Sequence, residues 1–260
     1  AEHLGKTDDE LLTRDEVARS INAEVKAGRG SEHGGAYLDI ASRVPADIIK
    51  KKLPSMYHQF KELAEVDITK QPMEVGPTCH YFMGGIRVNP DTQETNVGGL
   101  FACGECAAGL HGANRLGGNS LSDLIVFGHL AGHHAVEYAR RKIVAPQVDE
   151  EQVKAAMRHA TSFLNRESGF NPYVLHEELQ DMMQAKVGII RTQQELEEAV
   201  IDLEALEQKA REAKAHGSSQ YNPGWHEAIS LQSLLISAKA VTHAALTRQE
   251  TLPPASTSSI

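Results

Sequence analysis

Three glycine-rich segments lie close together between residues 76 and 120, and they constrain the fold more than any other feature of the chain. They read GPTCHYFMGGI, FACGE and HGANRLGGNS. Glycine has no side chain, so a ligand or another stretch of backbone can approach it closely. Tight turns alone do not need His80, Glu105, His111 and Arg115 beside the glycines, whereas a polar anionic ligand next to a flat ring would use such groups. The pattern therefore predicts a bound cofactor.

A long apolar segment follows the third glycine-rich segment directly. Residues 120–142, SLSDLIVFGHLAGHHAVEYARRK, have the length and spacing of a helix that is apolar on most sides, which predicts a buried helix. Ser120 is expected at the N-cap of this helix. There the helix dipole gives a partial positive charge that suits electron-rich ligand atoms.

The segments on either side of the glycine-rich region differ in kind. Before it we expect a mixture of helix and strand, and after it helices only, with leucine and alanine at helical spacing. The boundary is expected near KIVAPQVDEE, and the helices beyond it form a bundle. The expected elements are a helix over 7–29, a strand over 36–40, one or two helices around Pro54, a hairpin or small sheet over 77–104, helices within 149–215, and a helix over 226–249.

Charge and composition exclude several classes of function. The net charge is −9, and the basic residues are scattered, so nucleic acid is not expected as a partner. No run approaches about 18 apolar residues, and the first residues lack the pattern of a signal peptide. Three cysteines in 260 residues fit a reducing compartment, so a cytoplasmic location is expected.

Two groups of residues have the spacing of metal ligands, but neither predicts a metal site. Cys103 and Cys106 form a CxxC motif, and no second pair completes a zinc site, so they are expected to be small buried residues. His129 and His133 would share a helix face with His134 nearby, but the sequence shows no third ligand for them. No metal is therefore expected.

Several longer motifs resemble those of one protein family, the flavoprotein subunit of succinate dehydrogenase and fumarate reductase. They are HYFMGGI at 80–86, GLFACGE at 99–105, HGANRLGGNSL at 111–121 and NPGWHEAISLQ at 222–232. TRDEVARSINAEVKAGRG at 13–30, followed by HGGAYLDI and LPSMYHQF, is similar to the end of that subunit's capping domain.

The resemblance implies an α+β fold made of parts of three domains. Residues 1–75 would be the C-terminal part of the capping domain, and residues 76–145 the C-terminal segment of the FAD-binding domain, with short strands and a buried helix. Residues 146–250 would form a helical bundle domain, and residues 251–260 a disordered tail. The family's GxGxxG turn has no match here, so the resemblance covers the C-terminal portion of the subunit.

The resemblance also assigns roles to single residues. His80 and Arg115 match the residues that bind the carboxylates of the dicarboxylate substrate. Glu105 matches a glutamate that contacts FAD, and Ser120 and Leu121 match the pair whose backbone lies against the isoalloxazine ring. Arg115 suits the carboxylate-binding role, because a guanidinium binds a carboxylate through two parallel hydrogen bonds and so fixes its orientation.

Arg14 matches the arginine that the family uses as proton acceptor or shuttle. Since the free pKa of arginine lies above about 12, it would need neighbouring carboxylates to act as a relay. Without the resemblance, Arg14 would be read as a solvated charge on a helix surface, because most helix charges are solvated.

The expected function is therefore interconversion of succinate and fumarate, with hydride transfer to or from FAD. Electrons would pass to an iron-sulfur subunit, then to membrane anchor subunits, with the protein peripheral on the cytoplasmic face of the cell membrane. Two alternatives stay open. One is an L-aspartate oxidase-type flavoenzyme, which shares much of the pattern. The other is a non-catalytic fragment that lacks the FAD-binding N-terminal half.

Overall fold

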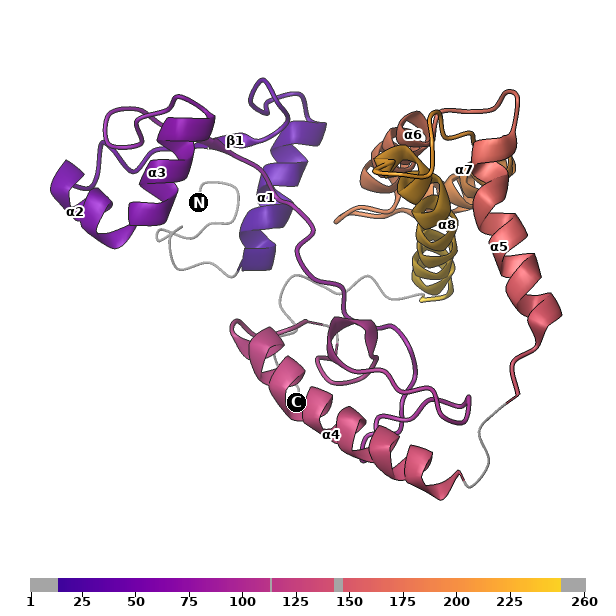
Figure 1. The fold of residues 1–260 in the computed structure, drawn as a ribbon. Helices are drawn as coiled ribbons and strands as arrows, with labels where there is room; N and C mark the ends of the chain where they lie inside the picture. The colour runs from indigo at the N-terminus through magenta and orange to yellow at the C-terminus, as the bar shows by residue number, and fades with distance from the viewer. Residues whose placement is uncertain (1–13, 113, 143–146, 249–260) are drawn as a thin grey trace. The chain divides into compact units, whose positions relative to one another are not determined.

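The structure is a computed structural model that describes residues 14–112, 114–142 and 147–248 (Figure 1). The chain divides into two compact units. One unit is the continuous segment Thr78–Asp149, and the other combines the segments Ala1–Pro77 and Glu150–Ile260. The predicted disordered tail at 251–260 lies outside the described residues.

The segment before residue 78 mixes helices with one small sheet, as the sequence predicts. Two helices meet at Pro54, the first residue of the second helix, because proline fits the first turn but not a helix interior. Ile49, Ile68 and Met73 form its buried cluster. Its elements are α1 (Arg14–Lys26), β1 (Ala36–Leu38), α2 (Ala46–Lys52), α3 (Pro54–Leu63) and β2 (Met73–Val75).

The two strands pair antiparallel, with Ala36 opposite Val75 and Leu38 opposite Met73. Gly35 precedes this pairing, and a Cβ on it would lie 2.2 Å from the carbonyl oxygen of Val75. Only glycine permits this approach of the two backbones. Among the described residues this is the one sheet, so the helical part of the predicted α+β class is confirmed and the strand part is small.

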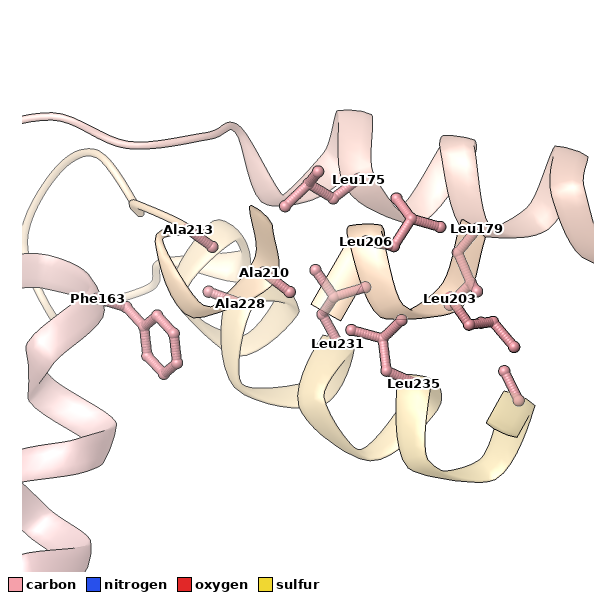
Figure 2. Packing of buried hydrophobic residues seen from close by; sticks show 11 residues of the cluster. Phe163, Leu175, Leu179, Leu203, Leu206, Ala210, Ala213, Ala228, Leu231 and Leu235 are labelled. Atoms are coloured by element: carbon pink, nitrogen blue, oxygen red, sulfur yellow. The ribbon is translucent and has the colours of Figure 1, made fainter. Parts of the chain in front are cut away.

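Four helices form the C-terminal bundle. They are α5 (Glu150–Asn165), α6 (Pro172–Lys186), α7 (Gln193–Arg211) and α8 (Pro223–Thr247). Figure 2 shows their apolar side chains meeting in one cluster, in which α8 contributes Leu231 and Leu235 and α7 contributes Leu203. Phe163 reaches the cluster from α5. Burial of this apolar area is the main force that holds four helices together.

Side-chain caps define where three of these helices begin. Asn171 and Asn222 each accept a hydrogen bond from a backbone N–H in the first turn, and proline follows each of them. Thr192 and Glu195 form a capping box, in which each side chain bonds the other's backbone N–H. Such caps satisfy N–H groups that have no partner inside the helix.

By length and composition alone, α8 could cross a membrane, with a mean hydropathy of 1.2. The sequence pattern predicts no such segment. In the bundle, however, α8 buries Ala228, Leu231, Leu235 and Ala238 against the other helices. This packing accounts for part of its apolar character, since 22% of the apolar window is buried and Ile236 is 68% exposed.

The segment Thr78–Asp149 consists of loops laid along one long helix, α4 (Asn119–Arg141). The hairpin predicted for 77–104 is reduced to isolated bridges, Ile86 with Ala107 and Glu94 with Phe101. A short 3-10 helix, η2 (Gly104–Cys106), packs against α4. Glycines interrupt the extended pattern in this segment, so no regular ladder forms among the described residues of Thr78–Asp149.

The prediction that α4 is buried is wrong for the described chain. The helix forms as expected over almost the predicted range, but only Asp123 and Ala131 are buried, and Leu121 and Ile125 are 67% and 74% exposed. A helix pattern that is apolar on most sides shows that the helix has surface to bury, but not which chain segment covers it. The loops of this unit cover only part of α4.

Candidate functional site

Tyr81 lies at the centre of a cluster that joins two glycine-rich segments to α4. Its hydroxyl donates a hydrogen bond to Asp123 Oδ2 at 3.3 Å, and His111 Nε2 lies 3.1 Å from the same hydroxyl. The ring of His111 meets that of Tyr81 edge to face, with centroids 5.4 Å apart. His111 Nε2 is also 3.4 Å from Asp123 Oδ2. The three side chains therefore form one closed polar network.

Arg115 stacks on this network from the third glycine-rich segment. Its guanidinium carbon lies 4.5 Å from the centroid of the Tyr81 ring. Its Nε is buried and has no hydrogen-bond partner in the described part of the chain, and its Nη1 makes only a 3.4 Å contact with the carbonyl of Leu116. A buried N–H without an acceptor costs about 1–3 kcal/mol, which fits a site that a ligand completes.

The HYFMGGI segment is held against η2 by backbone contacts and by Glu105. The backbone N–H of Phe82 donates to Glu105 Oε1 at 2.8 Å. Ile86 donates to the carbonyl of Cys106 at 2.8 Å, and Ala108 donates back to the carbonyl of Ile86 at 2.9 Å. Glu105 itself is exposed. The pairing thus leaves its carboxylate accessible while fixing the loop that carries His80.

Glycines let the GLFACGE segment approach α4 closely. A Cβ on Gly104 would lie 2.7 Å from a methyl carbon of Leu124, and one on Gly99 would lie 2.7 Å from the ring of Tyr138. Both positions also have positive φ angles, 75° and 85°. Packing on α4 therefore accounts for the glycines at these two positions.

Replacing Gly85 by alanine is expected to open the pairing between HYFMGGI and η2. Gly85 has a φ of 125°, and its Cβ would lie 2.3 Å from the carbonyl oxygen of Cys106. Because that oxygen accepts the N–H of Ile86, we expect hydrogen exchange at Ile86 and Ala108 to be at least about tenfold faster.

Gly84 provides the matched control for this variant. It also has a positive φ, 112°, but a Cβ on it would meet nothing within 4 Å. The two alanine variants therefore share the backbone strain and differ in the clash. Equal exchange rates at Ile86 in both variants would show that the contact with Cys106 does not hold the loop.

Ser120 is not the N-cap of α4, contrary to the prediction. The N-cap is Gly118, with a φ of 84°, and no side chain caps the helix, so Ser120 lies inside the first turn. The left-handed backbone at Gly118 starts the helix two residues earlier than a serine cap would. Open space surrounds Gly117 and Gly118, since a Cβ on either would meet nothing within 4 Å.

The structure brings three predicted site residues into one neighbourhood. His80 adjoins Tyr81, Arg115 stacks on Tyr81, and Glu105 bonds the next residue, Phe82. The His80 side chain is exposed. Arg14 is the first described residue of α1, in the other unit, and its role stays a prediction.

Tyr81 and Asp123 belong to this cluster, and the sequence prediction did not include them. Asp123 is 4% exposed and is the one buried charged side chain among the described residues. A single aspartate in the apolar run SLSDLIVF was the available signal, because a charge on a buried face needs partners. Nothing in the local pattern pointed to Tyr81, whose partner lies 42 residues away.

The cysteine and histidine groups have the following geometry. Cys103 is half-buried and Cys106 is exposed, so the prediction of small buried residues is wrong for Cys106, the last residue of η2. Glu137 lies 3.4 Å from both His133 and His134, a carboxylate that the sequence prediction did not include. Arg141 also pairs with Glu137, so this carboxylate has a cationic partner without a metal ion.

The chain is similar to known proteins along most of its length. A family model described as an FAD binding domain matches residues 5–121, which include Tyr81, His111 and Arg115. A second model, described as the C-terminal part of the fumarate reductase flavoprotein, matches residues 176–252 in the bundle. The chain is thus of the class of FAD-dependent flavoproteins, and FAD is the cofactor of this class.

Named relatives define the family more closely. The chain is 40% identical to a subunit of the fumarate reductase (CoM/CoB) of Methanothermobacter marburgensis over 244 residues, covering 93% of this chain and 43% of that protein. It is 34% identical to the succinate dehydrogenase flavoprotein subunit of Coxiella burnetii, covering 93% of this chain and 43% of that protein. The chain belongs to the family of succinate dehydrogenase and fumarate reductase flavoprotein subunits.

A solved structure shows the same fold. The structure described as Mycobacterium smegmatis Sdh1 in complex with UQ1 superposes with a TM-score of 0.87 at 55% identity, covering 95% of this chain and 41% of that chain. The chain spans less than half the length of these relatives.

Proposed function

We propose that this chain forms the substrate-binding side of a flavoprotein that interconverts succinate and fumarate. The observation that carries the proposal is Arg115, a cation with no carboxylate partner among the described residues and with a buried Nε that lacks an acceptor. A dicarboxylate would supply that acceptor through two parallel hydrogen bonds. His80, next to the ring on which Arg115 stacks, would donate to the second carboxylate.

The first turn of α4 and the Glu105 turn fit a bound FAD. Backbone at Gly117 and Gly118 is open, and the neighbouring Leu116 and Leu121 are 73% and 67% exposed. An exposed apolar surface beside open backbone suits a flat ring lying against it. Ser120 and Leu121 would contact that ring through their backbone, and Glu105 would bind a polar part of the cofactor. When bound, FAD supplies the acceptor or donor of the hydride.

The residues of this chain would fix the substrate during the reaction. Arg115 and His80 would hold the two carboxylates, so that one C–H bond is aimed and the molecule does not rotate. A proton leaves the neighbouring carbon, and Arg14 would relay it. Since arginine stays protonated, this relay needs a carboxylate beside it to take the proton onward. Asp15 and Glu16 follow Arg14 in α1.

The surroundings of the chain are part of the proposal. The relatives are named as subunits, and on that ground membrane anchor subunits and an iron-sulfur subunit are proposed as partners, with the protein peripheral on the cytoplasmic face of the membrane. The division into the end of a capping domain, part of an FAD-binding domain and a helical bundle domain is proposed as well, with limits at residues 75, 145 and 250.

The test uses a joined flavoprotein, in which this chain is joined to the part of the Mycobacterium smegmatis relative that the match leaves uncovered. Expected results are FAD absorbance that remains with the protein during gel filtration and reduction of an artificial electron acceptor that depends on succinate. Loss of all FAD would support the non-catalytic alternative. Retained FAD with oxidation of L-aspartate by oxygen, and no turnover of succinate, would support the L-aspartate oxidase alternative.

A further inference from the structure

The network around Tyr81 includes two side chains, Asp123 and His111, that are too buried to contact a substrate directly. Asp123 is 4% exposed, and the His111 side chain is 11% exposed. A carboxylate buried this far is costly unless it accepts hydrogen bonds from well-placed donors. The donor here is the Tyr81 hydroxyl, and His111 Nε2 lies 3.4 Å from the same carboxylate oxygen. Their position on Asp123 fixes the plane of the Tyr81 ring.

The proton of the Tyr81 hydroxyl is held firmly in this arrangement. Burial, together with the negative charge of Asp123, raises the pKa of Tyr81. The hydroxyl thus stays a donor to Asp123 Oδ2, and its oxygen can accept from His111 Nε2. A hydroxyl bonded on both sides holds its ring in one orientation.

Arg115 is held by its flat face rather than by its edge. The guanidinium lies over the Tyr81 ring at 4.5 Å, a cation–π contact that uses none of the N–H groups in its plane. An ion pair with a protein carboxylate would occupy those groups, and none is present among the described residues. Stacking therefore fixes the cation without using the N–H groups of its edge.

We propose that Tyr81 is a positioning residue for Arg115, fixed by Asp123 and His111, which presents the edge of the guanidinium to a substrate carboxylate. The identity of that carboxylate rests on the proposed function, whereas the stacking does not. Three residues that do not contact substrate would thus determine how tightly Arg115 binds it. Loss of the ring should weaken binding more than loss of the hydroxyl.

The test compares Tyr81→Leu, which removes the ring, with Tyr81→Phe, which keeps the ring and removes the hydroxyl. Malonate, a dicarboxylate that is not turned over, is titrated into the joined flavoprotein. We expect its Kd to rise about tenfold in Tyr81→Leu and about two- to threefold in Tyr81→Phe. The effect is larger in Tyr81→Leu because that variant loses the cation–π contact with Arg115, whereas Tyr81→Phe keeps it. Partial rescue by phenylalanine distinguishes positioning from a general structural effect.

Tyr138 gives the matched control. Lys142 Nζ lies 4.8 Å from the centroid of the Tyr138 ring, and Phe101 packs against the same ring. Tyr138→Leu therefore removes a tyrosine that, like Tyr81, contacts a cation in the same unit. Because the ring of Tyr138 stacks on these residues and not on Arg115, malonate binding should stay within about twofold of the parent. A tenfold loss in Tyr138→Leu would show that the effect at Tyr81 is not specific.

A second measurement reports the stacking directly and needs no substrate. In the 260-residue chain with labelled arginine, the ring of Tyr81 should shift the Arg115 side-chain proton resonances upfield. The shift should persist in Tyr81→Phe and disappear in Tyr81→Leu. A shift that survives in Tyr81→Leu overturns the proposal, and so does an unchanged malonate Kd in that variant. If the shift behaves as expected but the parent binds no malonate, the proposed function fails and the stacking stands.

Discussion

Replacing Arg115 by lysine is expected to lower kcat/KM for succinate about a hundredfold in the joined flavoprotein. Lysine keeps the positive charge but offers a single ammonium in place of a planar fork, so it cannot form two parallel hydrogen bonds to a carboxylate. It also loses the flat face that stacks on Tyr81. A hundredfold loss corresponds to about 2.7 kcal/mol of transition-state stabilisation, within the range for a buried charged hydrogen bond.

Steady-state kinetics with succinate and with fumarate measure this effect in both directions. Arg87 offers a matched control, because it is an exposed arginine in the same unit, directly after the HYFMGGI segment. Arg87→Lys should leave kcat/KM within about twofold of the parent, as is usual for surface substitutions. Near-normal kinetics in Arg115→Lys, with FAD still bound, would refute the assignment of Arg115 as the carboxylate ligand.

Local sequence patterns predicted the helices well. Residues 46–63 form two helices around Pro54, and α8 begins at Pro223 after the capping side chain of Asn222, because proline and cap residues act within one turn. The N-cap of α4, in contrast, was predicted wrongly, because the prediction relied on a capping side chain. A glycine in left-handed conformation started the helix, and glycine carries no side chain that would identify it as a cap.

Contacts between distant segments could not be read from the pattern. The exposure of α4 depends on which segment covers it, and its own periodicity contains no information on that. Likewise, the residue types of His80, Glu105 and Arg115 marked a candidate site, whereas the network of Tyr81, His111 and Asp123 is defined only by the fold. The sequence singled out His111 beside the glycines, but neither Tyr81 nor Asp123, because their contact joins segments far apart in the chain.

Replacing Phe163 by alanine is expected to lower the free energy of unfolding of the bundle by about 3–5 kcal/mol. The side chain is 1% exposed and belongs to the cluster formed with α7 and α8, as Figure 2 shows. Removing a buried aromatic ring loses its transfer free energy and leaves a cavity that the surrounding helices fill only in part. Since α5 enters the cluster through Phe163, its docking on α8 should weaken most.

Trp225 is the one tryptophan of the chain and reports this docking, since its Nε1–H donates to the carbonyl of Ala160 in α5 at 2.7 Å. Urea unfolding followed by its fluorescence should therefore show the loss in Phe163→Ala. Met157 lies on the same helix and is 63% exposed, so Met157→Ala should change stability by less than about 0.5 kcal/mol. If both variants unfolded at the same urea concentration, burial of Phe163 would not be the interaction that docks α5 on the bundle. Polar contacts such as that of Trp225 with Ala160 would then have to account for the docking.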